Sequence, residues 1–328
     1  ARAAKDILLR LAEVFPHYLV RAGYSYGEIA DMDPHVAARQ INNLPEDELV
    51  YPPNKPDRRL HTGYWSASRI GTSGMDGGWV GRMALAYDLV CTAVDKGVPV
   101  FSGDERKLIE RDLLIEGAYL AYFDQGINNK SVGNRCGAAA VGMVVGLPAL
   151  THFGLEGFRK TVDDWFLPDG GTSESAAYAM MTMGGVMDFA LLFRGYSDPA
   201  GYRDAEGLRL DNFNACLSTR FGDCWQSLLW TLQGNLRHPP AADSYRTTGI
   251  SGSYAEYLQL CYPTPQHLAF LRETVAQEPT GGAAYLATLY RDPNLADSDR
   301  TPFLLPDVVF PYLAQGFLRT GDTGRDSL

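Results

Sequence analysis

Apolar side chains recur at helical spacing in one segment of this chain after another. In residues 5–20, for example, Leu8, Leu11 and Phe15 fall on one face of a helix. Clusters of Gly, Pro and Asp separate these segments and are typical of turns. We therefore predict a mainly α fold, with helices near residues 5–20, 78–95, 104–123, 133–147, 154–165, 174–194, 208–232, 252–261, 265–276 and 281–290.

Two of these segments share a further pattern. In Gly126–Gly146 and in Pro168–Ala190, a loop rich in Gly, Asn and Asp leads into a helix of Ala, Gly and Met. Helices of small residues pack closely on their neighbours, as in the inner ring of a two-layer helical barrel, or toroid. An ordinary helical bundle would show the same pattern, so the periodicity leaves both architectures open.

The end of the chain differs from the rest. From Thr301 to Asp322 the sequence has several Pro residues and then an apolar stretch, which predicts a linker and a first β-strand. A lone strand is not stable, because its backbone groups need a partner. We therefore expect a helical domain over residues 1–300. Residues 301–328 would be a linker and the first strand of a second, β-rich domain whose remainder is missing.

Composition excludes several classes of protein. An apolar content of 45% excludes a disordered chain, and the net charge of −10 argues against a nucleic-acid binder. No apolar run approaches the roughly 20 residues of a membrane span. The five Cys residues are scattered and form no CxxC pair, so we expect neither a metal site nor a disulfide framework. Motifs for a P-loop, a nucleophile elbow and a zincin are absent, and we expect no cofactor.

The first candidate site is the loop at residues 127–135. It contains Asn128, Asn129, Lys130 and Arg135 but no acidic residue. Amide and cationic side chains donate hydrogen bonds to a carboxylate, and a helix N-terminus adds backbone N–H groups. The segment therefore predicts an anion site; the alternative is a polar loop with an Asn cap.

The second candidate site is the segment 168–178. A Gly pair permits a sharp turn, and Glu174 and Tyr178 share one face of the helix that follows. A Tyr beside cationic groups has a lowered pKa and can act as a base or an acid. The alternative is a core Tyr with a satisfied hydroxyl group.

Two further segments combine charged and aromatic residues. Segment 54–82, with Trp65 and Arg69, has five basic against two acidic side chains. Aromatic rings stack on sugars and Arg pairs with carboxylates, although a solvated loop with a core Trp is an equal alternative. Segment 237–246 brings His238 and Arg246 together with an Asp and a Tyr. It is either a binding loop or a plain surface loop with an Asp–Arg pair.

Taken together, these segments resemble the heparinase II/III-like and oligoalginate-lyase superfamily of polysaccharide lyases. The Asn128-Asn129 pair is similar to that family's Asn-Asn-His motif, and Pro168-Asp169-Gly170-Gly171…Glu174…Tyr178 is similar to its Asp-Gly-Gly…Glu-Gly-Pro…Tyr motif. Ala242-Asp243-Ser244 resembles its Gly-Asp-Ser loop, and residues 310–321 resemble the start of its β-sandwich. The resemblance covers residues 54–322 and implies an incomplete (α/α) toroid followed by antiparallel sheets.

The resemblance also implies a reaction, β-elimination at a uronic acid in an acidic polysaccharide. Asn129 would face the substrate carboxylate, and Tyr178 would transfer protons at C5 and O4. The substrate contacts would be Asn128, Arg135, Arg69, Trp65, Glu174, His238 and Arg246. A periplasmic or secreted location follows from the resemblance, and a homo-oligomer stays an open alternative.

One position departs from the family motif, because Lys130 stands where the family has His. Three interpretations are open. In the first, Tyr178 serves as both base and acid; in the second, Lys130 is a base with a lowered pKa; in the third, the site is inactive. We favour the first interpretation. The alternative functions are a uronate C5-epimerase, an (α/α)-barrel glycoside hydrolase using Asp169 and Glu174, and a non-catalytic carbohydrate-binding protein.

Overall fold

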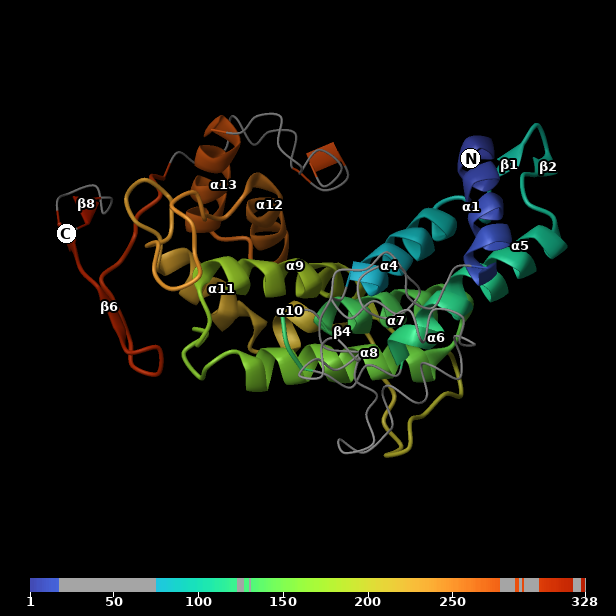
Figure 1. The fold of residues 1–328 in the computed structure, drawn as a ribbon, viewed down its shortest axis with the longest axis horizontal. Coiled ribbons are helices and arrows are strands. Elements are labelled where there is room, and N and C mark those ends of the chain that lie inside the picture. The colour runs from blue at the N-terminus through green and yellow to red at the C-terminus, as the bar shows by residue number, and fades with distance from the viewer. Residues whose placement is uncertain are drawn as a thin grey trace, which may run out of the picture. The chain divides into compact units, whose positions relative to one another are not determined.

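The chain divides into two compact units, each formed from two stretches of sequence. The computed structural model describes residues 1–17, 75–122, 127–129, 131–277, 287–288, 291, 301–320 and 326–327. Unit 1 comprises residues 1–159 and 196–211, and unit 2 comprises residues 160–195 and 212–328. Helices dominate the described residues of both units, which confirms the prediction of a mainly α fold (Figure 1).

Unit 1 is built from six helices within the described residues. They are α1 (Arg2–Val14), α4 (Met75–Asp88), α5 (Gly103–Ile109), α6 (Glu116–Tyr122), α7 (Ser131–Val145) and α8 (Pro148–Lys160). Residues 110–115 join α5 to α6 by a π-helical turn. The short strands β1 (Val94–Asp95) and β2 (Val98–Pro99) form a hairpin between α4 and α5.

Helix α7 is the centre of unit 1. Every residue from Ser131 to Gly142 is buried, as expected for a helix surrounded by others. Glycines make the close approach possible. A Cβ on Gly77 of α4 would lie 2.2 Å from the Asn134 Cα, and one on Gly154 of α8 would lie 2.5 Å from the Arg135 carbonyl oxygen. The small residues of α7 therefore serve close packing, as predicted.

Unit 2 contains the second helix of small residues. This helix is α9 (Ala176–Leu192). The other α-helices described in unit 2 are α10 (Ala215–Ser218), α11 (Phe221–Trp230), α12 (Gly252–Cys261) and α13 (Pro265–Gln277). Strand β3 (Arg194–Tyr196) pairs with β4 (Phe213–Asn214). Tyr254 and Tyr257 of α12 donate hydrogen bonds to the Met180 carbonyl and the Asp188 carboxylate of α9. These bonds fix α12 against α9.

The last described segment forms strands, but they are short. Strand β5 (Val308–Phe310) pairs antiparallel with β6 (Gln315–Phe317), and β7 (Arg319–Thr320) pairs with β8 (Asp326–Ser327). Both strand pairs belong to unit 2. The segment that contains them buries Phe303 and Phe310, and the Arg319 guanidinium donates to the Trp230 carbonyl at 2.7 Å. The division at residue 300 and the β-sandwich stay predictions.

Most of the predicted helices agree with the structure, but one is divided and three differ at their ends. The helix predicted over 208–232 consists of α10 and α11, separated at Thr219, and residue 194 lies in β3 rather than at the end of a helix. Residues 94–95 form a strand rather than the end of a helix, because a turn with Lys96 and Gly97 at positive φ starts the β1–β2 hairpin. Residues 208–214 are also not helical: Asn212 has a positive φ, and Asn214 caps α10. The helix predicted over 281–290 lies almost wholly outside the described residues.

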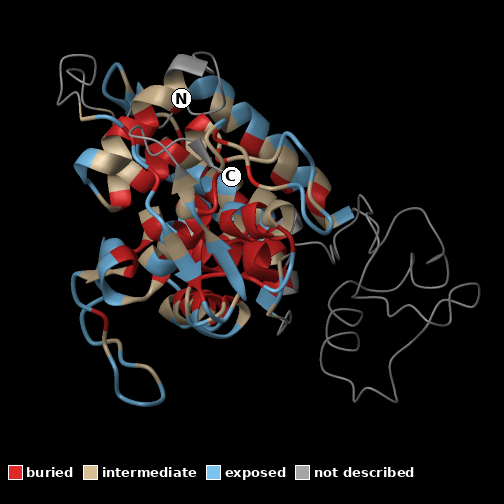
Figure 2. Cartoon of the chain, turned by 90° about the vertical axis from the view of Figure 1, so that its left-hand side faces the viewer, coloured by how far each residue is buried: buried red, intermediate tan, exposed pale blue. Residues whose placement is uncertain are grey.

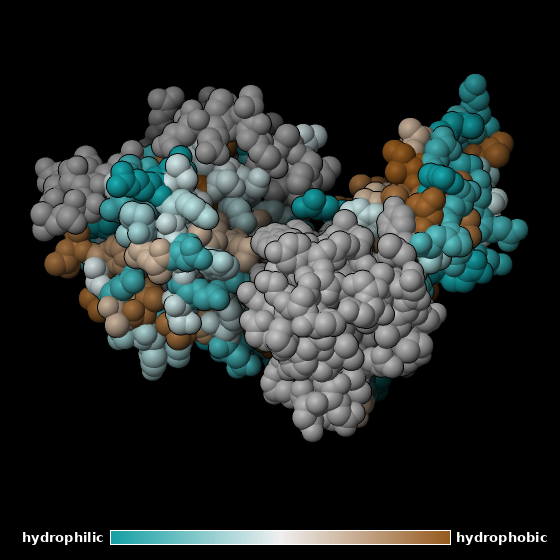
Figure 3. Space-filling view, in the orientation of Figure 1, coloured by the Kyte–Doolittle hydropathy of each residue, from teal (hydrophilic) through white to brown (hydrophobic). Residues whose placement is uncertain are grey.

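Burial follows the helices. Many of the buried residues lie on α7 and α9. Figure 2 shows the buried residues gathered inside the helical part, whereas apolar surface occurs in small patches among hydrophilic residues (Figure 3). Within the described part of the chain, no helix is both long enough and apolar enough to cross a bilayer.

Candidate functional site

Two of the segments singled out in the sequence meet in unit 2. The Ser175 hydroxyl donates to the Asp243 carbonyl oxygen at 2.9 Å, and the Ala177 amide donates to the Ser244 hydroxyl at 3.0 Å. Ser175 also accepts from the Tyr178 amide at 3.3 Å and so caps the start of α9. The Asp-Gly-Gly…Tyr segment and the loop at residues 237–246 are thus held together at the N-terminus of one helix.

Tyr178 is half-buried in the first turn of α9. A hydrogen bond to the Asp243 side chain, reinforced by the negative charge of that carboxylate and of Glu174, raises the pKa of the Tyr178 phenol. Sequence reasoning placed cationic groups beside this Tyr and expected a lowered pKa. That expectation is wrong, because the neighbours are carboxylates, and Tyr178 is therefore a protonated phenol at neutral pH.

A cavity of about 630 Å³ lies beside this junction, entirely within unit 2. Its walls come from the 166–179 segment, from α11, from the loop at 238–242 and from the β5–β6 hairpin. Its polar lining residues are Thr172, Ser173, Glu174, Ser175, Ser227, Thr231, His238 and Gln315, and its aromatic ones are Phe166, Tyr312 and Phe317. A cavity of this size is large enough for a small ligand or one or two sugar rings.

His238 lies on the wall of this cavity and is 1% exposed. Its amide donates to the Thr248 carbonyl at 2.8 Å, and its Nδ1 is 3.3 Å from the Thr231 hydroxyl. Burial lowers the pKa of His238 to about 4, so the ring is neutral at neutral pH. A neutral imidazole does not supply positive charge to a substrate carboxylate.

Asp169 and Gly170 shape the turn that leads to α9. The Asp169 carboxylate accepts from the amides of Gly171, Tyr312 and Leu313 at 3.1, 2.7 and 3.0 Å. Gly170 has φ +80°, and a Cβ there would lie 2.1 Å from the Asp223 carbonyl oxygen. Asp169 therefore ties this turn to the β5–β6 hairpin, which does not fit the acid or base role considered for it in a hydrolase.

The Asn-rich segment lies in unit 1, at the start of α7. Asn128 is exposed and its side chain accepts from the Ser131 amide at 2.9 Å, so it acts as the Asn cap considered above. Asn129 is half-buried beside the same helix N-terminus, and Lys130 lies outside the described residues. Arg135 is 1% exposed, with its guanidinium 3.9 Å from the Phe153 ring and donating to the Phe153 carbonyl at 3.0 Å. It stabilises the packing of α7 on α8, and its burial does not fit a substrate contact.

Of the four remaining residues predicted to contact substrate, two are exposed and two lie outside the described residues. Glu174 is exposed on the cavity wall, and Arg246 is exposed on the loop that carries Asp243. Trp65 and Arg69 lie outside the described residues. Ser175 and Asp243 are the site residues that sequence reasoning did not select. Two signals pointed to Asp243, the weak likeness of Ala242-Asp243-Ser244 to the family loop and the titratable groups of segment 237–246.

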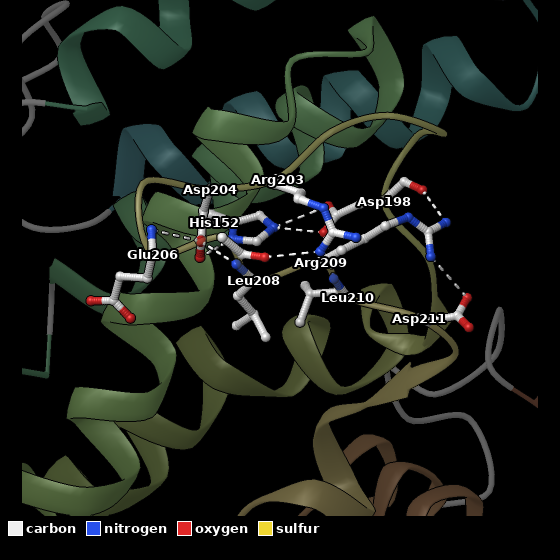
Figure 4. A network of polar contacts seen from close by, with 10 residues as sticks. His152, Asp198, Arg203, Asp204, Glu206, Leu208, Arg209, Leu210 and Asp211 are labelled. Carbon is white, nitrogen blue, oxygen red and sulfur yellow. Dashed lines mark hydrogen bonds and ion pairs between the residues drawn. The ribbon is translucent and has the colours of Figure 1, made fainter.

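A second polar cluster, missed in the sequence, lies in unit 1 around His152 (Figure 4). Its Nε2 is 2.9 Å from a carboxylate oxygen of Asp198, and its Nδ1 is 3.6 Å from that of Asp204. Asp198 also accepts from the Leu210 amide at 2.6 Å, and Asp204 from the Leu208 amide at 2.7 Å. The cluster fastens the 197–211 loop onto α8, which is a structural role.

No triad of His, Cys, Asp or Glu suited to a metal ion is found in the described ranges. The chain was also compared with known proteins. No protein-family model and no curated protein sequence matches it.

Proposed function

We propose that the chain is a polysaccharide lyase that cleaves a uronic-acid-containing polymer by β-elimination. The observation that carries the proposal is the influence of the Asp243 carboxylate on the Tyr178 phenol, whose pKa it raises. Neither residue lines the cavity, but their chain neighbours Ala179 and Ala242 do. Tyr178 and Asp243 come from two segments that were singled out separately for their likeness to the lyase motifs. Their junction at the N-terminus of α9 supports a common site.

The Tyr–Asp pair suggests how protons would move. In β-elimination the C5–H bond breaks, a C4–C5 double bond forms, and the C4–O bond breaks with a proton delivered to O4. A phenol with a raised pKa keeps its proton at neutral pH, so it can take the C5 proton only if another group accepts the proton that it already holds. In our proposal Tyr178 takes the C5 proton while passing its own proton to Asp243, and the phenol then protonates O4 and recovers the proton from Asp243.

Other parts of the proposal rest on the resemblance alone. These are the contact of Asn129 with the substrate carboxylate, an auxiliary role of Lys130, the incomplete (α/α) toroid with a following β-sandwich, and a periplasmic or secreted location. The hydrogen-bond capacity of an amide suits stabilisation of the enolate-like intermediate.

The experiment that tests the proposal is a screen of alginate, glucuronan, hyaluronan, chondroitin and heparan with the purified protein. Elimination leaves a double bond conjugated to the carboxylate, which absorbs in the ultraviolet. We expect one of these polymers to yield this absorbance with time. If no polymer of the panel does so, the lyase proposal is wrong.

A glycoside hydrolase is the second candidate, because two carboxylates face the same Tyr. Both Asp243 and Glu174 raise the Tyr178 pKa through their charge, and Glu174 lines the cavity. Paired carboxylates are the usual acid and base of glycoside hydrolysis. New reducing ends without the ultraviolet chromophore would identify this activity and exclude elimination.

A further inference from the structure

The hydrogen bonds around His238 determine which ring nitrogen carries the proton. The Thr231 hydroxyl donates to the Leu228 carbonyl at 3.1 Å, which uses its single proton. The same oxygen therefore accepts from Nδ1 of His238. Since the ring is neutral, its proton is on Nδ1 and Nε2 carries a lone pair. Nε2 is buried and has no hydrogen-bond partner within the described residues.

This lone pair defines the kind of group that suits His238. A bare nitrogen acceptor attracts a hydroxyl or an N–H group and repels a carboxylate or sulfate oxygen. The rest of the lining agrees with this preference. No Lys or Arg is among the lining residues, all of which are described, and the charged residue among them is the acidic Glu174. Arg319 lies close to one wall, with its guanidinium 5.4 Å from the Phe317 ring centroid, but it donates to the Trp230 carbonyl and is not a lining residue. An anion would therefore meet no cation on the cavity walls.

The walls also match the shape and chemistry of a sugar ring. Tyr312 and Phe317 offer aromatic faces, on which the C–H face of a pyranose packs. Ser227 offers a hydroxyl group that can both donate and accept, whereas the single proton of the Ser175 hydroxyl is already donated to the Asp243 carbonyl. Aromatic faces with neutral polar groups and one unpaired acceptor are typical of sites for uncharged sugars.

We propose that this cavity is a subsite for an uncharged sugar unit, with Nε2 of His238 accepting a hydrogen bond from one of its hydroxyl or amide groups. The inference deepens the proposed function, because it describes the substrate as a polymer in which the uronate is joined to a neutral sugar. A homopolymer of uronate would place a carboxylate where the cavity offers no positive charge.

Direct binding of monosaccharides tests the proposal. Glucose, galactose, mannose, N-acetylglucosamine and N-acetylgalactosamine would be titrated into the full chain, with glucuronate and galacturonate as anionic counterparts, by ligand-observed NMR. At least one neutral sugar should bind saturably, and neither uronate should displace it. Binding of a uronate at least as tight as that of every neutral sugar, or no neutral binding at all, would overturn the proposal.

Variants assign the binding to His238. His238→Leu removes the acceptor and should raise the Kd about tenfold, which is the loss of one ordinary hydrogen bond. The control is His267→Leu, because His267 lies in α13 of the same unit, contacts the Tyr262 carbonyl and is not a lining residue. It should bind as the unmodified chain does. An unchanged Kd in folded His238→Leu would contradict the proposal.

Two measurements keep the test valid if His238→Leu does not fold. Tyr312→Ala removes an aromatic wall from an exposed side chain and should also weaken binding. In the unmodified chain, affinity should fall as the pH approaches about 4, where Nε2 becomes protonated. If neither occurs, the proposal fails.

Neutral-sugar binding without any ultraviolet product would refute the lyase function alone, and a uronate product without neutral-sugar binding would refute this inference alone.

Discussion

At the scale of single residues, burial and neighbours determine the protonation of the site. His238 is neutral because it is buried, and Tyr178 keeps its proton because Asp243 accepts from it. The sequence shows a Tyr and a His in suitable motifs, but it does not show whether carboxylates or cations surround them. The predicted direction of the Tyr178 pKa shift was wrong for this reason.

Stability should depend on pH through His238. Its pKa is about 4 in the folded chain and about 6.5 in an unfolded one, so between these values only the unfolded chain binds the proton. The free energy of unfolding should therefore fall as the pH drops from 6.5 to 4, by roughly 3 kcal/mol from this residue. Urea titrations of the unmodified chain and of His238→Gln at several pH values measure the difference.

The variant comparison isolates this contribution from that of the carboxyl groups. His238→Gln should show a flatter dependence between pH 6.5 and 4. His17→Gln changes an exposed ring and should follow the unmodified chain. Parallel curves for His238→Gln and the unmodified chain would mean that the buried ring does not remain neutral.

At the scale of elements, glycines determine how closely helices approach. Gly77 and Gly78 are neighbours in α4, but a Cβ at Gly77 would meet the α7 backbone at 2.2 Å, whereas nothing lies within 4 Å of one at Gly78. Gly77→Ala should destabilise the protein by about 1–3 kcal/mol through overpacking. Gly78→Ala should be neutral or stabilise it by up to about 1 kcal/mol, because Ala favours helix. Thermal unfolding measures both, and equal effects would contradict the close contact.

The 197–211 loop depends on the buried Asp198 side chain. Asp198→Ala would remove the acceptor of the Leu210 amide and of His152, and should cost about 3 kcal/mol. Hydrogen exchange of the Leu210 amide should become faster. Asp211→Ala is the control, because Asp211 is largely exposed and its pair with Arg209 contributes at most about 1 kcal/mol. Unchanged exchange in Asp198→Ala would show that other contacts hold the loop.

Much of the element order could be predicted from the sequence, since periodicity identifies amphipathic helices such as α12. What could not be predicted depends on positive-φ residues and on tertiary contacts. Lys96 and Asn212 both have a positive φ, and the turn residues beside them, Gly97 and Asp211, were outweighed by the apolar periodicity of the predicted helices. The site was predicted in part: Tyr178, Glu174 and His238 were identified, but the partner of Tyr178 lies 65 positions away and depends on folding. Arg135 was predicted to contact an anion, because the local sequence shows its charge but not its burial, which depends on tertiary packing.

At the scale of the whole molecule, the two units are interleaved in sequence. The chain passes from unit 1 to unit 2 after residue 159, returns for residues 196–211, and then enters unit 2 again. The returning segment is the loop fastened by Asp198 and His152. The candidate site is assembled within unit 2 from three stretches, one before and two after this loop. Long-range contacts of this kind have no local signal in the sequence.

The central claim is that Tyr178 performs elimination, and ultraviolet product formation by Tyr178→Phe tests it most directly on a polymer that the unmodified chain cleaves. The account predicts a rate lower by about 10²–10⁴-fold with the substrate affinity nearly unchanged, because the phenol transfers protons and the ring remains. The control is Tyr202→Phe, which should keep full activity, because Tyr202 packs against His152 in unit 1 and is not among the groups that act on Tyr178. Turnover of Tyr178→Phe at the rate of the unmodified chain would contradict the account.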